Sequence, residues 1–220
     1  MNNLSNTNND SLLSKVYLEL ENSIINGVFE QGAALNETKL SKELGVSRTP
    51  IREALRMLEQ EGLVKIVPNR GAVVIGVSKA DINDIYTVRM FIEGLCAKRA
   101  CEKISSSQLD ELEKNIDLQE FYAQKGNTEK LLELDGEFHK IIYEASDSRI
   151  LKSLLTNFHH YSAKARELSM KNGLRKAPSI NEHKAIFEAI KNKNQMDAEK
   201  LTKEHITNAK KNVTECLNQN

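Results

Sequence analysis

The amino-acid sequence predicts a mainly α protein built in two parts. Residues 43–63 contain two helical segments joined by a tight turn, and the short β-branched runs 64–67 and 72–75 flank turn-forming residues. From about residue 79, helical periodicity continues almost to the C-terminus, with no proline between residues 69 and 177. These observations predict an N-terminal winged helix-turn-helix followed by an antiparallel all-α helical bundle.

The chain of 220 residues is long enough for two compact domains of ordinary size. We expect a disordered N-terminal tail over residues 1–10, a winged helix-turn-helix over 11–76, a linker over 77–80 and a helical domain over 81–217. The first ten residues lack the features of a signal peptide, and no run is apolar enough to span a membrane. A cytoplasmic location without membrane contact is therefore expected.

The helices of the first part have local start and stop signals. Asn36 is expected to cap a short helix that Gly45 ends in the left-handed conformation, and Ser47 is expected to cap the next helix with its hydroxyl. Pro50 falls in the first turn of that helix, where the missing N–H costs little. An apolar stripe then follows at helical spacing, composed of Ile51, Ala54, Leu55 and Leu58.

The opposite face of the same helix is cationic. Arg48, Arg52 and Arg56 recur every four residues, so their guanidinium groups line one exposed face. The part as a whole is not basic, because residues 1–78 contain 8 lysines and arginines against 9 aspartates and glutamates, a net charge of −1. A local cationic face in a domain of this kind predicts salt-sensitive binding that depends on dimerisation for affinity.

The run from Val46 to Leu55, with the Glu61-Gly62-Leu63 segment before the hairpin, resembles the DNA-binding domain of the GntR family of bacterial transcription regulators. The resemblance spans residues 12–76 and implies contacts with DNA bases and phosphates from one helix and from the tip of the hairpin. The residues that match these positions are Ser47, Arg48, Thr49 and Arg52 on the helix, and Arg70 and Gly71 at the tip.

The second part is expected to contain six helices, over about 79–103, 106–125, 127–146, 148–172, 178–193 and 195–217. Four polar residues, Asp135, His139, His183 and His205, fall on or beside the apolar faces of three of them. Burying an aspartate and three imidazoles is costly unless they are paired or bind a cation. A shared divalent metal satisfies all four, and these ligands suit Zn²⁺, Ni²⁺ or another first-row ion.

The segments Asp135-Gly-Glu-Phe-His139, residues 182–190 and Glu204-His-Ile206 resemble the FCD ligand-binding domain of the FadR branch of the GntR family. In that family the aspartate and three histidines hold a metal, and a small carboxylate effector binds there with the help of an arginine from the first helix. Arg89 matches that arginine. Six helices resemble the shorter, VanR-like variant of the domain. His159 and His160 are not predicted as ligands, although His159 is placed at the edge of the cavity.

Together these features predict a homodimeric regulator, in the common case a repressor, that leaves a pseudo-palindromic DNA operator when a small carboxylate binds at the metal. Two alternatives remain open. One is a metalloenzyme that uses the Asp/His₃ site, although no general base is evident; the other is a sensor in which the metal itself is the effector. Three cysteines without paired metal-ligand spacing are expected to be buried, reduced thiols.

Overall fold

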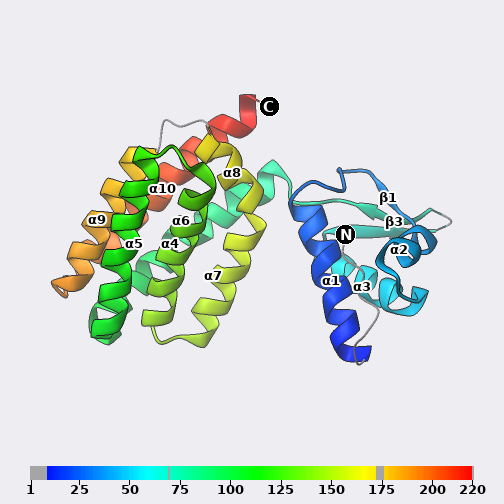
Figure 1. Ribbon diagram of the computed structural model, residues 1–220, viewed down its shortest axis with the longest axis horizontal. Helices are drawn as coiled ribbons and strands as arrows, with labels where there is room; N and C mark the ends of the chain where they lie inside the picture. Colours follow the sequence, from blue (N-terminus) through cyan, green and yellow to red (C-terminus); the bar gives the residue numbers. More distant parts are fainter. Residues whose placement is uncertain (1–8, 69, 172–175, 220) are drawn as a thin grey trace. The chain divides into compact units, whose positions relative to one another are not determined.

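The computed structural model describes residues 9–68, 70–171 and 176–219, which form two compact units that divide between Ser78 and Lys79 (Figure 1). The predicted disordered tail lies outside the described residues as far as residue 8, whereas the last two residues of that tail belong to helix α1 (Asn9–Ile25). The predicted linker is also partly helical, because α4 (Lys79–Lys103) begins within it. Asp81 in the first turn of α4 favours a helix start there.

The first unit is the predicted winged helix-turn-helix. Helices α1, α2 (Glu37–Leu44) and α3 (Arg48–Gln60) precede a hairpin of β2 (Val64–Val67) and β3 (Gly71–Val74). A two-residue strand that was not expected, β1 (Ala34–Leu35), pairs with β3 and completes an antiparallel sheet of order β1-β3-β2. The buried core joins α1 to the predicted apolar stripe of α3, and includes Val16, Leu20, Ile24, Ile51, Ala54, Leu55 and Leu58.

The turn between α2 and α3 is built largely as expected. The Asn36 side chain accepts hydrogen bonds from the backbone N–H groups of Thr38 and Lys39, and Gly45 ends α2 with φ 67°. Ser47 occupies the N-cap of α3 in an extended conformation, but the predicted hydroxyl cap is wrong. The third helical position after Ser47 is Pro50, which lacks the N–H that a capping hydroxyl commonly bonds.

The second unit is an antiparallel helical bundle (Figure 1). Helix α10 (Gln195–Gln219) packs along α4, while α5 (Ser106–Gln124) packs against α6 (Thr128–Ala145) and α9 (Lys176–Lys191). The core contains Leu112, Phe138, Ile142, Leu155, Ile186 and Ile190. The three cysteines are buried thiols. Within the described residues, no helix combines the length and hydrophobicity needed to cross a lipid bilayer.

The predicted helix over 148–172 is wrong, because the described part of that segment forms two helices, α7 (Arg149–Tyr161) and α8 (Ala163–Lys171). At the break, the Ser162 hydroxyl donates to the carbonyl of Phe158 at 2.8 Å. A serine hydroxyl that bonds the preceding turn in this way competes with the backbone and bends helices. The described residues of the second unit therefore contain seven helices instead of six, and the VanR-like variant, which depends on the count, remains a prediction.

Candidate metal centre and nucleic-acid interface

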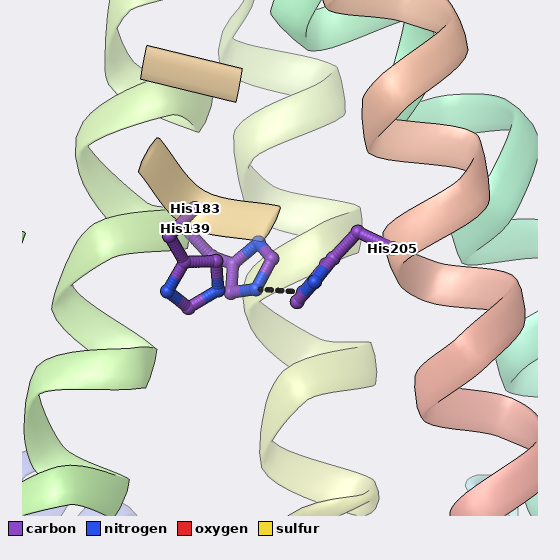
Figure 2. Close-up of side chains that lie close together, drawn as sticks. All are labelled: His139, His183 and His205. Carbon is purple, nitrogen blue, oxygen red and sulfur yellow. Dashed lines mark hydrogen bonds between the residues drawn. The ribbon is translucent and has the colours of Figure 1, made fainter. Parts of the chain in front are cut away.

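Three histidines from three helices meet inside the second unit. His139 lies on α6, His183 on α9 and His205 on α10, and each side chain is almost completely buried. Figure 2 shows the three imidazoles pointing toward one another. Their ring centroids lie 4.7 to 5.5 Å apart. One nitrogen atom from each ring lies within 4.8 Å of one from each of the others, which is close enough for one metal ion.

The Nδ1 atom of each histidine faces an oxygen atom. His139 Nδ1 lies 2.8 Å from Glu93 Oε2, and His205 Nδ1 lies 2.7 Å from Glu182 Oε2. His183 Nδ1 lies 2.8 Å from Gln119 Oε1. Each of these oxygens is a hydrogen-bond acceptor, so each favours a proton on the Nδ1 atom that faces it and leaves Nε2 as the metal-facing nitrogen.

The orientation of the Gln119 amide is itself fixed by a chain of hydrogen bonds. Gln119 Nε2 donates to Asn115 Oδ1 at 2.7 Å, and Asn115 Nδ2 donates to the backbone carbonyl of Leu134 at 3.1 Å. The amide oxygen of Gln119 is therefore the atom that faces His183. Neither amide residue was singled out in the sequence, because a glutamine and an asparagine on a helix give no signal of their own.

The two Nε2 atoms of His139 and His205 lie 3.2 Å apart (Figure 2). Since each ring has its Nδ1 proton fixed, the two lone pairs face each other unless a proton or a cation lies between them. Two nitrogen ligands of a tetrahedral zinc ion, each at about 2.0 to 2.1 Å, are themselves about 3.3 Å apart. The donor set and its spacing therefore fit a divalent metal.

Asp135, the fourth predicted ligand, is buried beside the histidines but is held by a cation. Its Oδ2 accepts a hydrogen bond from Arg166 Nη1 at 2.9 Å, and its Oδ1 lies 3.8 Å from His183 Nε2. His159, which was not predicted as a ligand, belongs with Asp135 and His139 to a second group whose ligand atoms lie within 4.8 Å of one another. The structure thus places all four predicted ligands in one region, with Asp135 at its edge.

Arg89, the predicted effector-binding residue, is buried on α4 and already paired. Its Nε donates to Glu93 Oε1 at 2.6 Å, and its guanidinium lies 4.8 Å from the centroid of the Tyr86 ring. The same carboxylate contacts His139, so Arg89, Glu93 and His139 form one chain of contacts. Arg89 also lines a small cavity of about 40 Å³, together with Asp135, His139, Arg166 and His205.

The ionisation of these groups follows from burial and neighbouring charges. Burial alone raises the pKa of Glu93, but Arg89 and His139 outweigh it, so the net pKa is lowered. Burial also raises the pKa of Asp135, and His139 and Arg166 again reverse the direction. Burial lowers the pKa of His205 and, with help from Arg166, that of His159. The carboxylates of Glu93 and Asp135 are therefore ionised, and the imidazoles of His159 and His205 favour the neutral form, which are the states that metal ligation requires.

We expect the metal-free protein to lose stability as the pH falls from 7.5 to 5.5. The folded pKa values of His159 and His205 lie below the ordinary 6.5, so the unfolded state binds more protons below that pH. Each such group costs about 1.4 kcal/mol per pH unit below its unfolded pKa. The melting temperature in a chelating buffer at pH 7.5, 6.5 and 5.5 measures the slope. His159→Gln is expected to flatten it, and an unchanged slope would refute this assignment.

The first unit carries the candidate nucleic-acid interface. Its predicted residues Ser47, Arg48, Thr49, Arg52, Arg70 and Gly71 are all exposed. Glu37 of α2, which was not predicted to take part, accepts hydrogen bonds from Arg48 at 3.1 Å and from Arg52 at 2.9 and 3.2 Å. The bond from Arg52 is the main reason that the pKa of Glu37 is lowered. One carboxylate therefore holds both arginines in a defined orientation.

A winged helix-turn-helix joined to a helical bundle with a buried histidine centre is the architecture of a class of DNA-binding regulators. Residues 12–74 match the bacterial regulatory proteins of the gntR family, and residues 84–208 match the FCD domain. The chain belongs to the GntR family, in the group with a C-terminal FCD domain, and is a DNA-binding transcription regulator.

Individual relatives support the same assignment along most of the chain. The uncharacterized regulator YdhC of Bacillus subtilis is 33% identical over 86% of this chain and 84% of its own length. The transcriptional repressor RspR of Escherichia coli is 26% identical over 94% of this chain and 90% of its own. The solved structure of E. coli McbR/YncC, 22% identical, shares the fold with a TM-score of 0.72 over 94% of this chain and 97% of its own. YdhC and RspR are both named as transcriptional regulators, which decides against the metalloenzyme alternative.

Proposed function

We propose that this protein is a homodimeric, cytoplasmic repressor that leaves a pseudo-palindromic operator when a small carboxylate binds at a metal ion in the helical domain. The part of this proposal that concerns the metal and the effector rests on the geometry of His139, His183 and His205. Their Nδ1 atoms all face oxygen acceptors, and the Nε2 atoms of His139 and His205 lie 3.2 Å apart. The metal supplies Lewis acidity that attracts an anion. Asp135 completes the ligand set, and Zn²⁺ is the ion that best suits it, with Ni²⁺ or another first-row ion as alternatives.

The DNA half of the proposal rests on the exposed arginines of α3 and on the wing. Arg48 and Arg52 read the major groove together with Ser47 and Thr49, and Arg70 with Gly71 brings the wing tip to the minor groove. A homodimer places two such helices on two half-sites, which multiplies a modest affinity per head. A regulator must bind its effector with different affinities in the DNA-bound and released states, because otherwise the effector changes nothing.

The central experiment measures fluorescence anisotropy of labelled DNA from the promoter of the protein's own gene. Protein stripped of metal, protein loaded with Zn²⁺ and loaded protein with added acids are compared, and sedimentation measures the oligomeric state in parallel. The proposal predicts a dimer that binds in both metal states and dissociates only when an acid is added to loaded protein. Dissociation on adding Zn²⁺ alone would show a metal sensor instead, and failure to bind promoter DNA more tightly than random DNA would refute the proposal.

We expect Glu37→Gln to increase the affinity for random-sequence DNA and to reduce discrimination in favour of the operator. The substitution removes a carboxylate that competes with DNA phosphates for Arg48 and Arg52, and it frees both side chains from their fixed orientation. The expected gain for random DNA is roughly 3- to 10-fold at low salt, with a steeper salt dependence. Glu53→Gln is the matched control, since Glu53 pairs with Arg56 on the same helix. An equal effect of the two variants would contradict a positioning role for Glu37.

A further inference from the structure

Two arginines, the buried Arg89 and the partly buried Arg166, line the cavity beside the histidine centre, and their N–H groups have different partners. Arg89 has its Nε on Glu93, its guanidinium over the Tyr86 ring and its Nη1 3.5 Å from Ser162 Oγ. The Arg89–Glu93 pair is almost completely buried, with 2% and 1% of the two side chains exposed. An ion pair so enclosed has its charge balanced within the protein, so Arg89 has little net charge to offer to a ligand.

Arg166 differs from Arg89 in three respects. It lies on α8, its side chain is 16% exposed, and its main contact is with Asp135 at 2.9 Å. Its Nε is buried and has no hydrogen-bond partner among the described residues. Its Nη2 makes only a long contact, 3.5 Å, with the backbone carbonyl oxygen of His159. A buried guanidinium with unused donors is unfavourable, and a planar carboxylate is the group that satisfies such donors best.

The partner of Arg166 is the predicted carboxylate ligand of the metal. A divalent ion at the histidines competes with Arg166 for the carboxylate of Asp135, because both are cations. Arg166 bonds the Oδ2 atom of Asp135, whose Oδ1 lies 3.8 Å from His183 Nε2. Once the metal takes Asp135, the Arg166 guanidinium loses its counter-ion inside a largely buried site. That loss is costly unless another anion replaces the carboxylate.

We propose that Arg166 is the anion-binding arginine of this domain, and that it exchanges Asp135 for the effector's carboxylate when a metal occupies the centre. This inference rests on the proposed metal site. It replaces Arg89 with Arg166 as the effector's direct ligand, and Arg89 then acts by positioning Glu93 and, through it, His139.

The charge balance also indicates the class of effector. Glu93 and Asp135 balance the two arginines, and Glu182 beside His205 adds a third carboxylate, so a divalent metal leaves one uncompensated positive charge. Lys140, which lines the neighbouring cavity, adds a second. Arg166 lines both the 40 Å³ cavity and a second cavity of about 280 Å³, whose other lining residues include Lys140, Thr156 and His160. The smaller space accommodates only a few atoms, whereas the second offers cationic and hydroxyl groups beyond Arg166. A dicarboxylate, with one end at the metal and Arg166, satisfies both the charge and the space.

The test measures Zn²⁺ binding to the stripped full-length protein by chelator competition, and then binding of succinate and propionate to the loaded protein by calorimetry. Arg166→Gln removes the cation that competes for Asp135, so we expect it to bind Zn²⁺ at least 5-fold more tightly than wild type. The same variant is expected to bind succinate at least 10-fold more weakly and to lose the wild-type preference for succinate over propionate. Arg166→Lys retains the charge and is expected to keep part of that preference.

Lys164→Gln is the matched control, because Lys164 lies on the same helix, is exposed and pairs with Glu167. The exchange predicts that Arg166→Gln binds Zn²⁺ more tightly and succinate more weakly than the wild type. A variant that had lost its fold would instead bind both ligands more weakly. The inference would be overturned if Arg166→Gln and Arg166→Lys bound Zn²⁺ and succinate equally more weakly than the wild type, or if the preference for succinate over propionate were unchanged. In either case, Zn²⁺ binding by the wild type would still support the metal site. Failure of the wild type to bind Zn²⁺ would overturn the proposed function, and the inference with it.

Discussion

Replacing Arg48 and Arg52 together by alanine is expected to abolish specific operator binding. Both side chains are about half exposed on α3, with 57% and 49% of their surfaces accessible, and Glu37 holds them in a fixed orientation. An arginine that reads a base pair contributes about 1 to 3 kcal/mol, so the double variant should lose at least about 30-fold in affinity. The substitution also leaves the Glu37 carboxylate without its partners, which adds repulsion toward the DNA phosphates.

The measurement is fluorescence anisotropy on promoter DNA over a series of salt concentrations. We expect a shallower dependence of the affinity on salt in the double variant, because two cations near phosphates are removed. Arg149→Ala is the matched control, since Arg149 is an exposed arginine at the start of α7 in the other unit. The fold should survive, because neither arginine of α3 contributes to the buried core. Unchanged binding by the double variant would rule out α3 as the recognition helix.

Replacing His139 by alanine is expected to eliminate the stabilisation of the protein by metal. His139 belongs to both groups of side chains that can hold an ion, and its Nε2 lies 3.2 Å from that of His205. At a free metal concentration 100 times the dissociation constant, binding stabilises the folded state by about 2.7 kcal/mol. For a chain of this size that corresponds to a rise in melting temperature of roughly 5 to 10 °C.

Thermal denaturation with Zn²⁺ and with a chelator measures this difference. The wild type should show the shift and His139→Ala should not, although its operator binding without effector should persist. His160→Ala is the control, because His160 is a neighbouring histidine that belongs to neither of the two metal-binding groups. A full thermal shift in His139→Ala would contradict a metal site at these histidines. The loss also bears on regulation, since an acid should no longer release the variant from DNA.

Much of the first unit was predictable because its signals are local. Asn36, Gly45 and the apolar stripe of α3 act through hydrogen bonds and contacts within a few residues, and the structure places them as expected. The hydroxyl cap from Ser47 failed for an equally local reason, the missing N–H of Pro50. Strand β1 was missed because two residues carry no periodicity, and its pairing with β3 depends on residues far along the chain.

The helical unit was predictable in its class and less so in its details. A long stretch without proline and with helical periodicity predicts a bundle, but it does not show where a serine hydroxyl breaks a helix. The bend at Ser162 separates α8 from α7, and α8 carries the arginine that pairs with Asp135. Arg166 is not among the site residues predicted from the sequence, because a polar helix face explains such a residue equally well.

The sequence by itself determined the family, the two-part architecture and the identity of the four candidate metal ligands, because these follow from local patterns and short motifs. Only the tertiary structure decided which groups face those ligands, and that Arg166 is the arginine that pairs with Asp135. Glu93, Gln119 and Glu182 come from three different helices to face three histidines, and Glu37 crosses from α2 to hold two arginines of α3. The physical reason is that hydrogen bonds and ion pairs act over about 3 Å in space, whatever the separation along the chain.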